Sequence, residues 1–158
     1  MFLADPQPAI ERISALIQLI HKDLEGIKND YCIIGSGALL LSGVNVSVHD
    51  LDILTSKRSA EKLISTWNSL KDLSYQPNES DRFRSTFGRF QFDLPVEVMG
   101  DLEVNQFGNW VRIEAKEVQH ISISGNAINI PSLADQVRIF RSLGREKDLN
   151  KIKLIKNL

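Results

Sequence analysis

Two aspartates, Asp50 and Asp52, stand one residue apart in an apolar segment, with Leu51 between them and Ile53 after them. Alternate side chains of a strand point to opposite faces, so in a strand over 48–54 both carboxylates leave one face, about 7 Å apart. Such a pair repels and loses hydration on a buried strand, so it requires a compensating cation. Lysine or arginine could supply this charge, but Mg²⁺ is the stronger candidate because it prefers carboxylate and water oxygens.

A glycine-rich turn lies upstream of these aspartates, where an apolar strand over 31–34 meets a short helix over 38–41. Gly35 and Ser36 fall at the helix N-terminus, where backbone N–H groups and the helix dipole favour an anion such as phosphate. A dinucleotide fold is the alternative, but Leu40 stands where the third glycine of its motif belongs. An anion site beside a dicarboxylate is what a nucleoside triphosphate with Mg²⁺ requires.

A third acid would complete this site. Glu97 lies between Val96 and Val98 in a predicted strand, so pairing with the aspartate strand would bring it about 5 Å from an aspartate. Asp93 and Asp101 are alternatives, but both stand beside turn residues, where acids commonly make local hydrogen bonds. We therefore predict the set Asp50, Asp52 and Glu97.

These motifs together resemble the DNA polymerase β-like nucleotidyltransferase superfamily, across about residues 31–104. The resemblance is to its small stand-alone members, which include minimal, antibiotic and toxin–antitoxin-type nucleotidyltransferases. It implies that Gly35 and Ser36 contact the triphosphate, and that the three acids bind Mg²⁺ or Mn²⁺. The segment 144–148 also resembles the Arg-x-Lys-Asp element of some such proteins.

The function implied by the resemblance is transfer of a nucleoside monophosphate from the triphosphate to a hydroxyl acceptor. The acceptor stays open among a small molecule, a tRNA end, a protein hydroxyl and another nucleotide. The alternative is a catalytically degenerate module of the same fold that works with a protein partner. Catalysis requires convergence of all three acids, whereas binding does not.

The C-terminal segment is rich in basic residues. Arg141, Arg145 and Lys147 are the candidates for contacting phosphate oxygens or an anionic substrate. The alternative is a solvated helix face, which such a charge pattern also describes.

Apolar periodicity predicts an α/β or α+β domain with a mixed sheet flanked by helices. An isoleucine and leucine stripe predicts a helix over 8–28, which packs on the domain's own sheet or, alternatively, on a partner or a second copy. A single domain is expected, with an N-terminal helix in 1–30, a core in 31–130 and C-terminal helices in 131–158. The expected core elements are strands 48–54, 82–92, 95–104, 111–123 and 127–130, a helix 59–70, a loop at 75–79, and turns at Asp93-Leu94 and Gly125-Asn126.

Composition narrows the functional class. A net charge of −1 over 158 residues argues against a protein that coats nucleic acid by bulk electrostatics. Cys32 is the only cysteine, which excludes an internal disulfide and a thiolate zinc site. No apolar run reaches the roughly 18 residues that span a bilayer, and no secretory leader is evident, so a cytoplasmic protein without membrane partners is expected.

Overall fold

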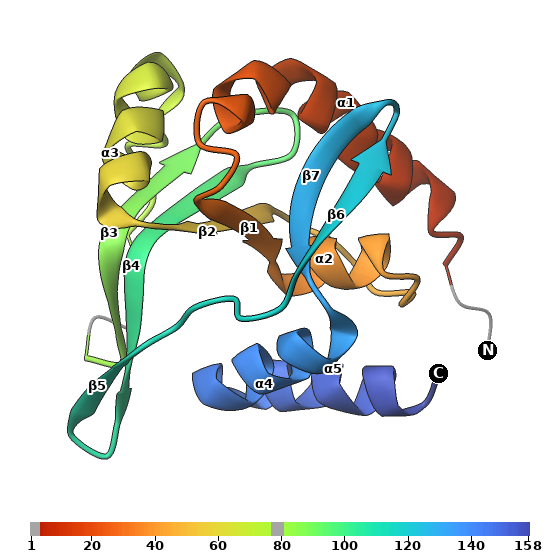
Figure 1. Ribbon diagram of the computed structural model, residues 1–158, viewed down its shortest axis with the longest axis vertical. Helices are drawn as coiled ribbons and strands as arrows, with labels where there is room; N and C mark the ends of the chain where they lie inside the picture. Colours follow the sequence, from red (N-terminus) through yellow and green to blue (C-terminus); the bar gives the residue numbers. More distant parts are fainter. Residues whose placement is uncertain (1–3, 77–80) are drawn as a thin grey trace.

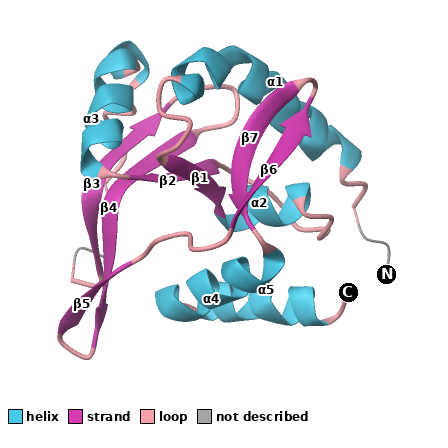
Figure 2. Cartoon of the chain, in the orientation of Figure 1, coloured by secondary structure: helices cyan, strands magenta, loops and turns pink. Residues whose placement is uncertain are grey.

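In the computed structural model, residues 4–76 and 81–158 are described, and they form a mixed β-sheet with helices on both faces (Figure 1; Figure 2). This is the predicted fold class, including the N- and C-terminal helices. Within these ranges, no helix combines the length and apolar character needed to cross a membrane. The elements in chain order are α1 (Gln7–Glu25), β1 (Tyr31–Ile34), α2 (Gly35–Leu41), β2 (Leu51–Thr55), α3 (Lys57–Thr66), a 3₁₀ turn (Asn68–Leu70), β3 (Phe83–Phe90), β4 (Val96–Gln106), β5 (Asn109–Arg112), β6 (Val118–Ile123), β7 (Asn126–Pro131), α4 (Leu133–Leu143) and α5 (Glu146–Lys156).

The main sheet has the strand order β1-β2-β4-β3, and β5 pairs with the far part of β4. Strands β2 and β4 are parallel, whereas the other neighbours are antiparallel. Strands β6 and β7 form a separate hairpin, and β7 lies against β1. Helices α1 and α3 cover one face of the main sheet, and α4 lies on the other with α5 beside it (Figure 1).

Helix α1 buries the predicted apolar stripe in the chain's own core. Ile13, Ile17 and Ile20 are almost fully buried and pack with β-sheet residues such as Leu51 and Ile53. The apolar stripe therefore packs in the chain's own core, as the spacing favoured. The helix ends at Glu25 rather than at residue 28.

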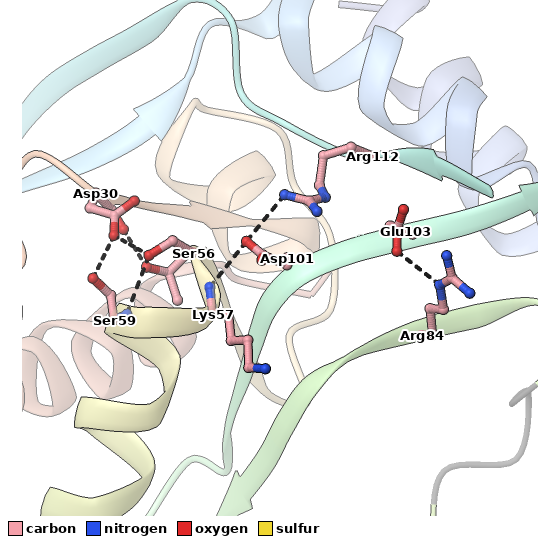
Figure 3. A network of polar contacts seen from close by, with 9 residues as sticks. Asp30, Ser56, Lys57, Ser59, Arg84, Asp101, Glu103 and Arg112 are labelled. Carbon is pink, nitrogen blue, oxygen red and sulfur yellow. Dashed lines mark hydrogen bonds and ion pairs between the residues drawn. The ribbon is translucent and has the colours of Figure 1, made fainter.

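Strand β4 changes the face that it buries halfway along its length. Val96 and Val98 pack in the cluster under α1 and α3, whereas Leu102 and Val104 pack in the cluster under α4. The change occurs at a bulge, where Asp101 has a φ of 51° and the register with β3 shifts. Asp101 accepts the Lys57 N–H at the start of α3 and pairs with Arg112, so the bulge is held by polar contacts (Figure 3).

Several predicted boundaries are corrected. Strand β2 begins at Leu51 rather than Val48, so Asp50 stands in a bend just before it. The single strand expected over 111–123 is two strands, β5 and β6, because the chain leaves the main sheet after Arg112.

The turn between β6 and β7 and the ends of α3 also differ from the prediction. The turn after β6 is Ser124-Gly125, which have φ values of 50° and 81°, so Asn126 begins β7 instead of completing the turn. Helix α3 begins earlier than residue 59 because the Ser56 hydroxyl caps the Ser59 N–H. It ends at Thr66, before the 3₁₀ turn. Most of the loop expected at 75–79 lies outside the described residues.

The C-terminal helices α4 and α5 lie within the range 131–158 predicted for them, and short-range contacts cap them. The Ser132 hydroxyl caps α4 by accepting the Asp135 N–H. Gly144, with a φ of 69°, ends α4 in the left-handed conformation that glycine tolerates best. Asp148 caps α5 by accepting the Arg145 N–H, and its carboxylate also binds the Arg145 guanidinium through both oxygens.

Candidate active site

Three acids converge at one end of the central strands. The parallel register of β2 and β4 places Asp52 opposite Glu97, and Asp50 approaches from the bend before β2. One carboxylate oxygen from each of the three lies within 4.8 Å of the others. The pairing expected for Glu97 is therefore present, although Asp50 reaches the cluster from a bend and not from within the strand.

Asp52 is the most perturbed member of the cluster. Burial raises the pKa of this carboxyl well above its usual value, and the negative charges of Asp50 and Glu97 raise it further. Its Oδ1 atom is buried and makes no hydrogen bond with the described residues. An orphaned carboxylate oxygen beside two further carboxylates is a donor set that suits a hard divalent cation such as Mg²⁺ or Mn²⁺.

The glycine turn lies directly against this carboxylate. Gly35 has a φ of 73°, and a Cβ atom added there would lie 2.6 Å from Oδ2 of Asp52. Position 35 thus requires glycine both for its backbone conformation and for the close approach of Asp52. Ser36 follows in the first turn of α2, which begins three residues earlier than predicted.

Arg89 of β3 is a member of the site that sequence reasoning missed. Its Nη1 atom lies 2.5 Å from Oε1 of Glu97 and 3.4 Å from Oδ2 of Asp50. Burial and the charge of Asp50 raise the pKa of Glu97, and the hydrogen bond from Arg89 opposes them. Arg89 lies directly opposite Glu97 in the β3–β4 register, a position that the predicted two-residue turn would give to Phe90.

Helix α5 brings positive charge to the same site. Burial dominates the carboxyl pKa values, but the charges of Arg145 and Lys151 act on Asp52 in the opposite direction, and that of Lys147 acts on Glu97. Lys151 is the second missed residue. Burial lowers its pKa, while the charges of Asp148 and Asp52 favour its protonated form.

The other candidates lie apart from the cluster. Asp93 is exposed and pairs with Arg12, and Asp101 holds the bulge of β4, so neither joins the triad. Arg141 lines a separate groove of about 700 Å³ between the end of α4 and the β4–β5 hairpin.

Comparison with known proteins gives the family. Residues 16–155 match the sequence profile of the aminoglycoside-2''-adenylyltransferase family. A search of curated proteins found no matching sequence.

Solved structures share the fold. A putative nucleotidyltransferase from Thermotoga maritima, TM1012, is similar with a TM-score of 0.69 and 24% identity, over 90% of this chain and 93% of that one. The antibiotic-resistance factor ANT(2'')-Ia gives a TM-score of 0.53 and 13% identity, over 90% and 83%. Lincomycin-bound LnuA, a lincosamide antibiotic adenylyltransferase, gives 0.51 and 14%, over 85% and 95%. With its profile match spanning most of the sequence, this chain belongs to the aminoglycoside-2''-adenylyltransferase family and has the fold of the small stand-alone nucleotidyltransferases.

Proposed function

We propose that this protein is a Mg²⁺- or Mn²⁺-dependent enzyme that transfers a nucleoside monophosphate from a nucleoside triphosphate to an acceptor hydroxyl. The observation that supports this most strongly is the convergence of Asp50, Asp52 and Glu97, with a buried Asp52 Oδ1 atom that has no hydrogen-bond partner among the described residues. Family membership supports the same reaction class. When bound, the divalent cation supplies charge stabilisation for the phosphate oxygens.

The three acids have distinct roles in this proposal. Asp50 and Asp52 hold the cation, and Glu97 both contributes a ligand oxygen and accepts the proton of the acceptor hydroxyl. In the metal-free site, burial raises the pKa of Glu97, and the hydrogen bond from Arg89 opposes this shift. The acceptor oxygen then forms a bond to the α-phosphorus, the bond from that phosphorus to the bridging oxygen breaks, and pyrophosphate leaves.

The phosphates lie between the glycine turn and α5 in this proposal. Gly35 and Ser36 present backbone N–H groups at the start of α2. Lys147 and Lys151 of α5, with Arg145 at its N-cap, supply positive charge, and their effect on the carboxyl pKa values supports their closeness to the acids. Charge at this position would neutralise the triphosphate and the departing pyrophosphate.

Lys151 replaces Arg141 in this set. Arg141 is exposed and lines another groove, so no contact in the described structure supports the phosphate role expected for it. Lys151 is half-buried and its charge acts on Asp52.

Transfer assays with different candidate acceptors would identify the acceptor. The family description and two structural neighbours name antibiotic adenylyltransferases, which makes ATP the first donor and an aminoglycoside or lincosamide hydroxyl the first acceptor to test. A tRNA end and a protein hydroxyl follow as further acceptors.

One observation favours the alternative of a degenerate binding module. The Arg89 guanidinium contacts Glu97 and Asp50, so a cation already neutralises part of the acidic cluster. If Arg89 stays there permanently, the protein would bind a partner or nucleotide without turnover.

The test is calorimetric titration with non-hydrolysable analogues of ATP and CTP, with and without Mg²⁺. Asp50→Ala is compared with Asp93→Ala, which removes an exposed aspartate with 90% side-chain exposure. Lys151→Met is compared with Lys153→Met, an exposed lysine of the same helix. Transfer of radiolabel from α-labelled ATP to each acceptor then measures turnover.

We expect Mg²⁺-dependent binding that Asp50→Ala abolishes and Lys151→Met weakens, while both controls bind normally. Labelled product would establish transfer. Nucleotide binding without transfer to any acceptor would favour the degenerate module, and binding that survives Asp50→Ala would refute the proposed metal site.

A further inference from the structure

Arg89 contacts the acidic cluster with only one end of its guanidinium. Its Nη1 atom lies 2.5 Å from Oε1 of Glu97 and 3.4 Å from Oδ2 of Asp50. The side chain is 19% exposed, and its position opposite Glu97 is fixed by the β3–β4 register. Arg89 is therefore a built-in cation of the cluster, placed there by the sheet itself.

This contact competes with a divalent cation for the same carboxylate oxygen. Mg²⁺ lies about 2.0–2.1 Å from its ligand oxygens. A guanidinium nitrogen at 2.5 Å from Glu97 Oε1 uses the same oxygen and would stand within a few ångströms of the metal. Two cations at that separation repel in a partly buried site, which favours withdrawal of the guanidinium when metal binds.

Other groups are available to receive the withdrawn guanidinium. The Nε atom of Arg89 lies 3.6 Å from Oδ2 of Asp72, and the guanidinium carbon lies 4.8 Å from the centroid of the Tyr75 ring. Asp72 is itself fixed, because both the Ser74 hydroxyl and N–H donate to it. Tyr75 is held by stacking on Phe87 at 5.7 Å.

We propose that Arg89 is a displaceable counter-ion of the active site, which occupies Glu97 and Asp50 until a divalent cation drives it onto Asp72 and Tyr75. This inference rests on the proposed metal site and deepens it. Arg89 lowers the affinity of the site for a free metal ion. A metal ion therefore binds effectively only together with the nucleotide, whose phosphates add ligand oxygens. It also keeps the acids paired when no metal is bound, which limits their mutual repulsion.

Two measurements test this without relying on catalysis. The first is calorimetric titration of Mn²⁺, without nucleotide, into the wild type, Arg89→Gln and Arg84→Gln. Arg84 is the matched control, since it lies on the same strand but pairs with Glu103 on the exposed part of the sheet (Figure 3). Loss of a competing charge-assisted hydrogen bond predicts that Arg89→Gln binds Mn²⁺ about tenfold or more tightly than the wild type, while Arg84→Gln is unchanged.

The second measurement uses the wild type alone, in case Arg89→Gln folds poorly. Titration of Mg²⁺ is followed by the ¹⁵N–¹H resonances of the arginine side-chain Nε groups. We expect the Arg89 resonance to shift at the concentrations that saturate the metal site, while the Arg84 resonance stays in place.

The outcomes separate this inference from the proposed function. Equal Mn²⁺ affinity of the wild type and Arg89→Gln, or weaker binding by the variant, would overturn the counter-ion role and leave the metal site standing. An unmoved Arg89 resonance at saturating Mg²⁺ would do the same. Absence of metal binding in both proteins, with or without nucleotide, would overturn the metal site and the counter-ion role together.

Discussion

Replacing Asp52 by asparagine should stabilise the metal-free protein. Asparagine has the same shape, but it removes a charge whose Oδ1 atom is buried and finds no partner in residues 4–76 and 81–158. The two neighbouring acids of this carboxylate are like charges within 4.8 Å. Each like-charge pair at that distance costs about 3–4 kcal/mol at an effective dielectric constant of 20. Arg89, which pairs with Asp50, and the positive charges of Arg145 and Lys151 oppose this repulsion.

The expected net gain is about 2 kcal/mol in the free energy of unfolding near neutral pH, within the range for relieving an unsatisfied buried group. For a chain of this size that is a rise in Tm of about 4–8 °C. The assay is urea unfolding in EDTA, followed by tryptophan fluorescence, since Trp67 is buried and reports on the core. Asp93→Asn, at an exposed position, is the control and should change stability by less than about 0.5 kcal/mol.

The gain should depend on pH with a defined sign. Because burial and like charges raise the pKa of Asp52, the folded state binds more protons than the unfolded state between about pH 4 and the raised pKa. The wild type therefore loses stability as pH rises through this window, and Asp52→Asn lacks the contribution of Asp52 to that loss. The advantage of the variant should be small at pH 4.5 and largest at pH 7.5.

Bound Mg²⁺ should make the wild type more stable than Asp52→Asn. Mg²⁺ at 100 times its Kd would stabilise the wild type by about 2.7 kcal/mol, and Asp52→Asn should gain far less. A variant that is less stable than the wild type in EDTA at pH 7.5, or an advantage that does not grow with pH, would refute the reasoning.

Three further changes test other parts of the structure. Gly35→Ala should destabilise the protein by about 1–3 kcal/mol and abolish nucleotide binding, because its Cβ would meet Asp52 from a positive φ; normal binding in calorimetry would contradict this. Asp148→Ala should cost about 3–5 kcal/mol in urea unfolding, because it leaves the Arg145 guanidinium without its buried partner. Asn129→Ala should cost about 1–3 kcal/mol, because its amide satisfies two backbone carbonyls; a change below 0.5 kcal/mol by the same assay would count against that network.

The fold class could be predicted because the hydrophobic pattern of each element matches the face that the element buries in the fold. The stripe of α1, the buried run of β1 and the caps of α4 each follow from spacing or from one capping residue. The acids Asp52 and Glu97 could be paired because each interrupts an apolar strand, and two buried carboxylates have few stable arrangements other than a shared cation.

The bulge at Asp101 could not be predicted, because the apolar alternation of β4 continues through it. Only the tertiary structure shows that Val98 and Leu102 belong to different clusters on opposite faces. The cause is one aspartate with positive φ, held by a helix N–H and by Arg112, and both of these partners are distant in sequence.

Arg89 was missed for a related reason. The predicted two-residue turn at Asp93-Leu94 would have placed Phe90 opposite Glu97, and a slip of one residue reverses the face of every side chain. The actual connection is longer, so Arg89 lies opposite Glu97 and enters the acidic cluster. Sequence spacing therefore determined which acids could meet. The length of the β3–β4 connection and the docking of α5 decided which cations meet them.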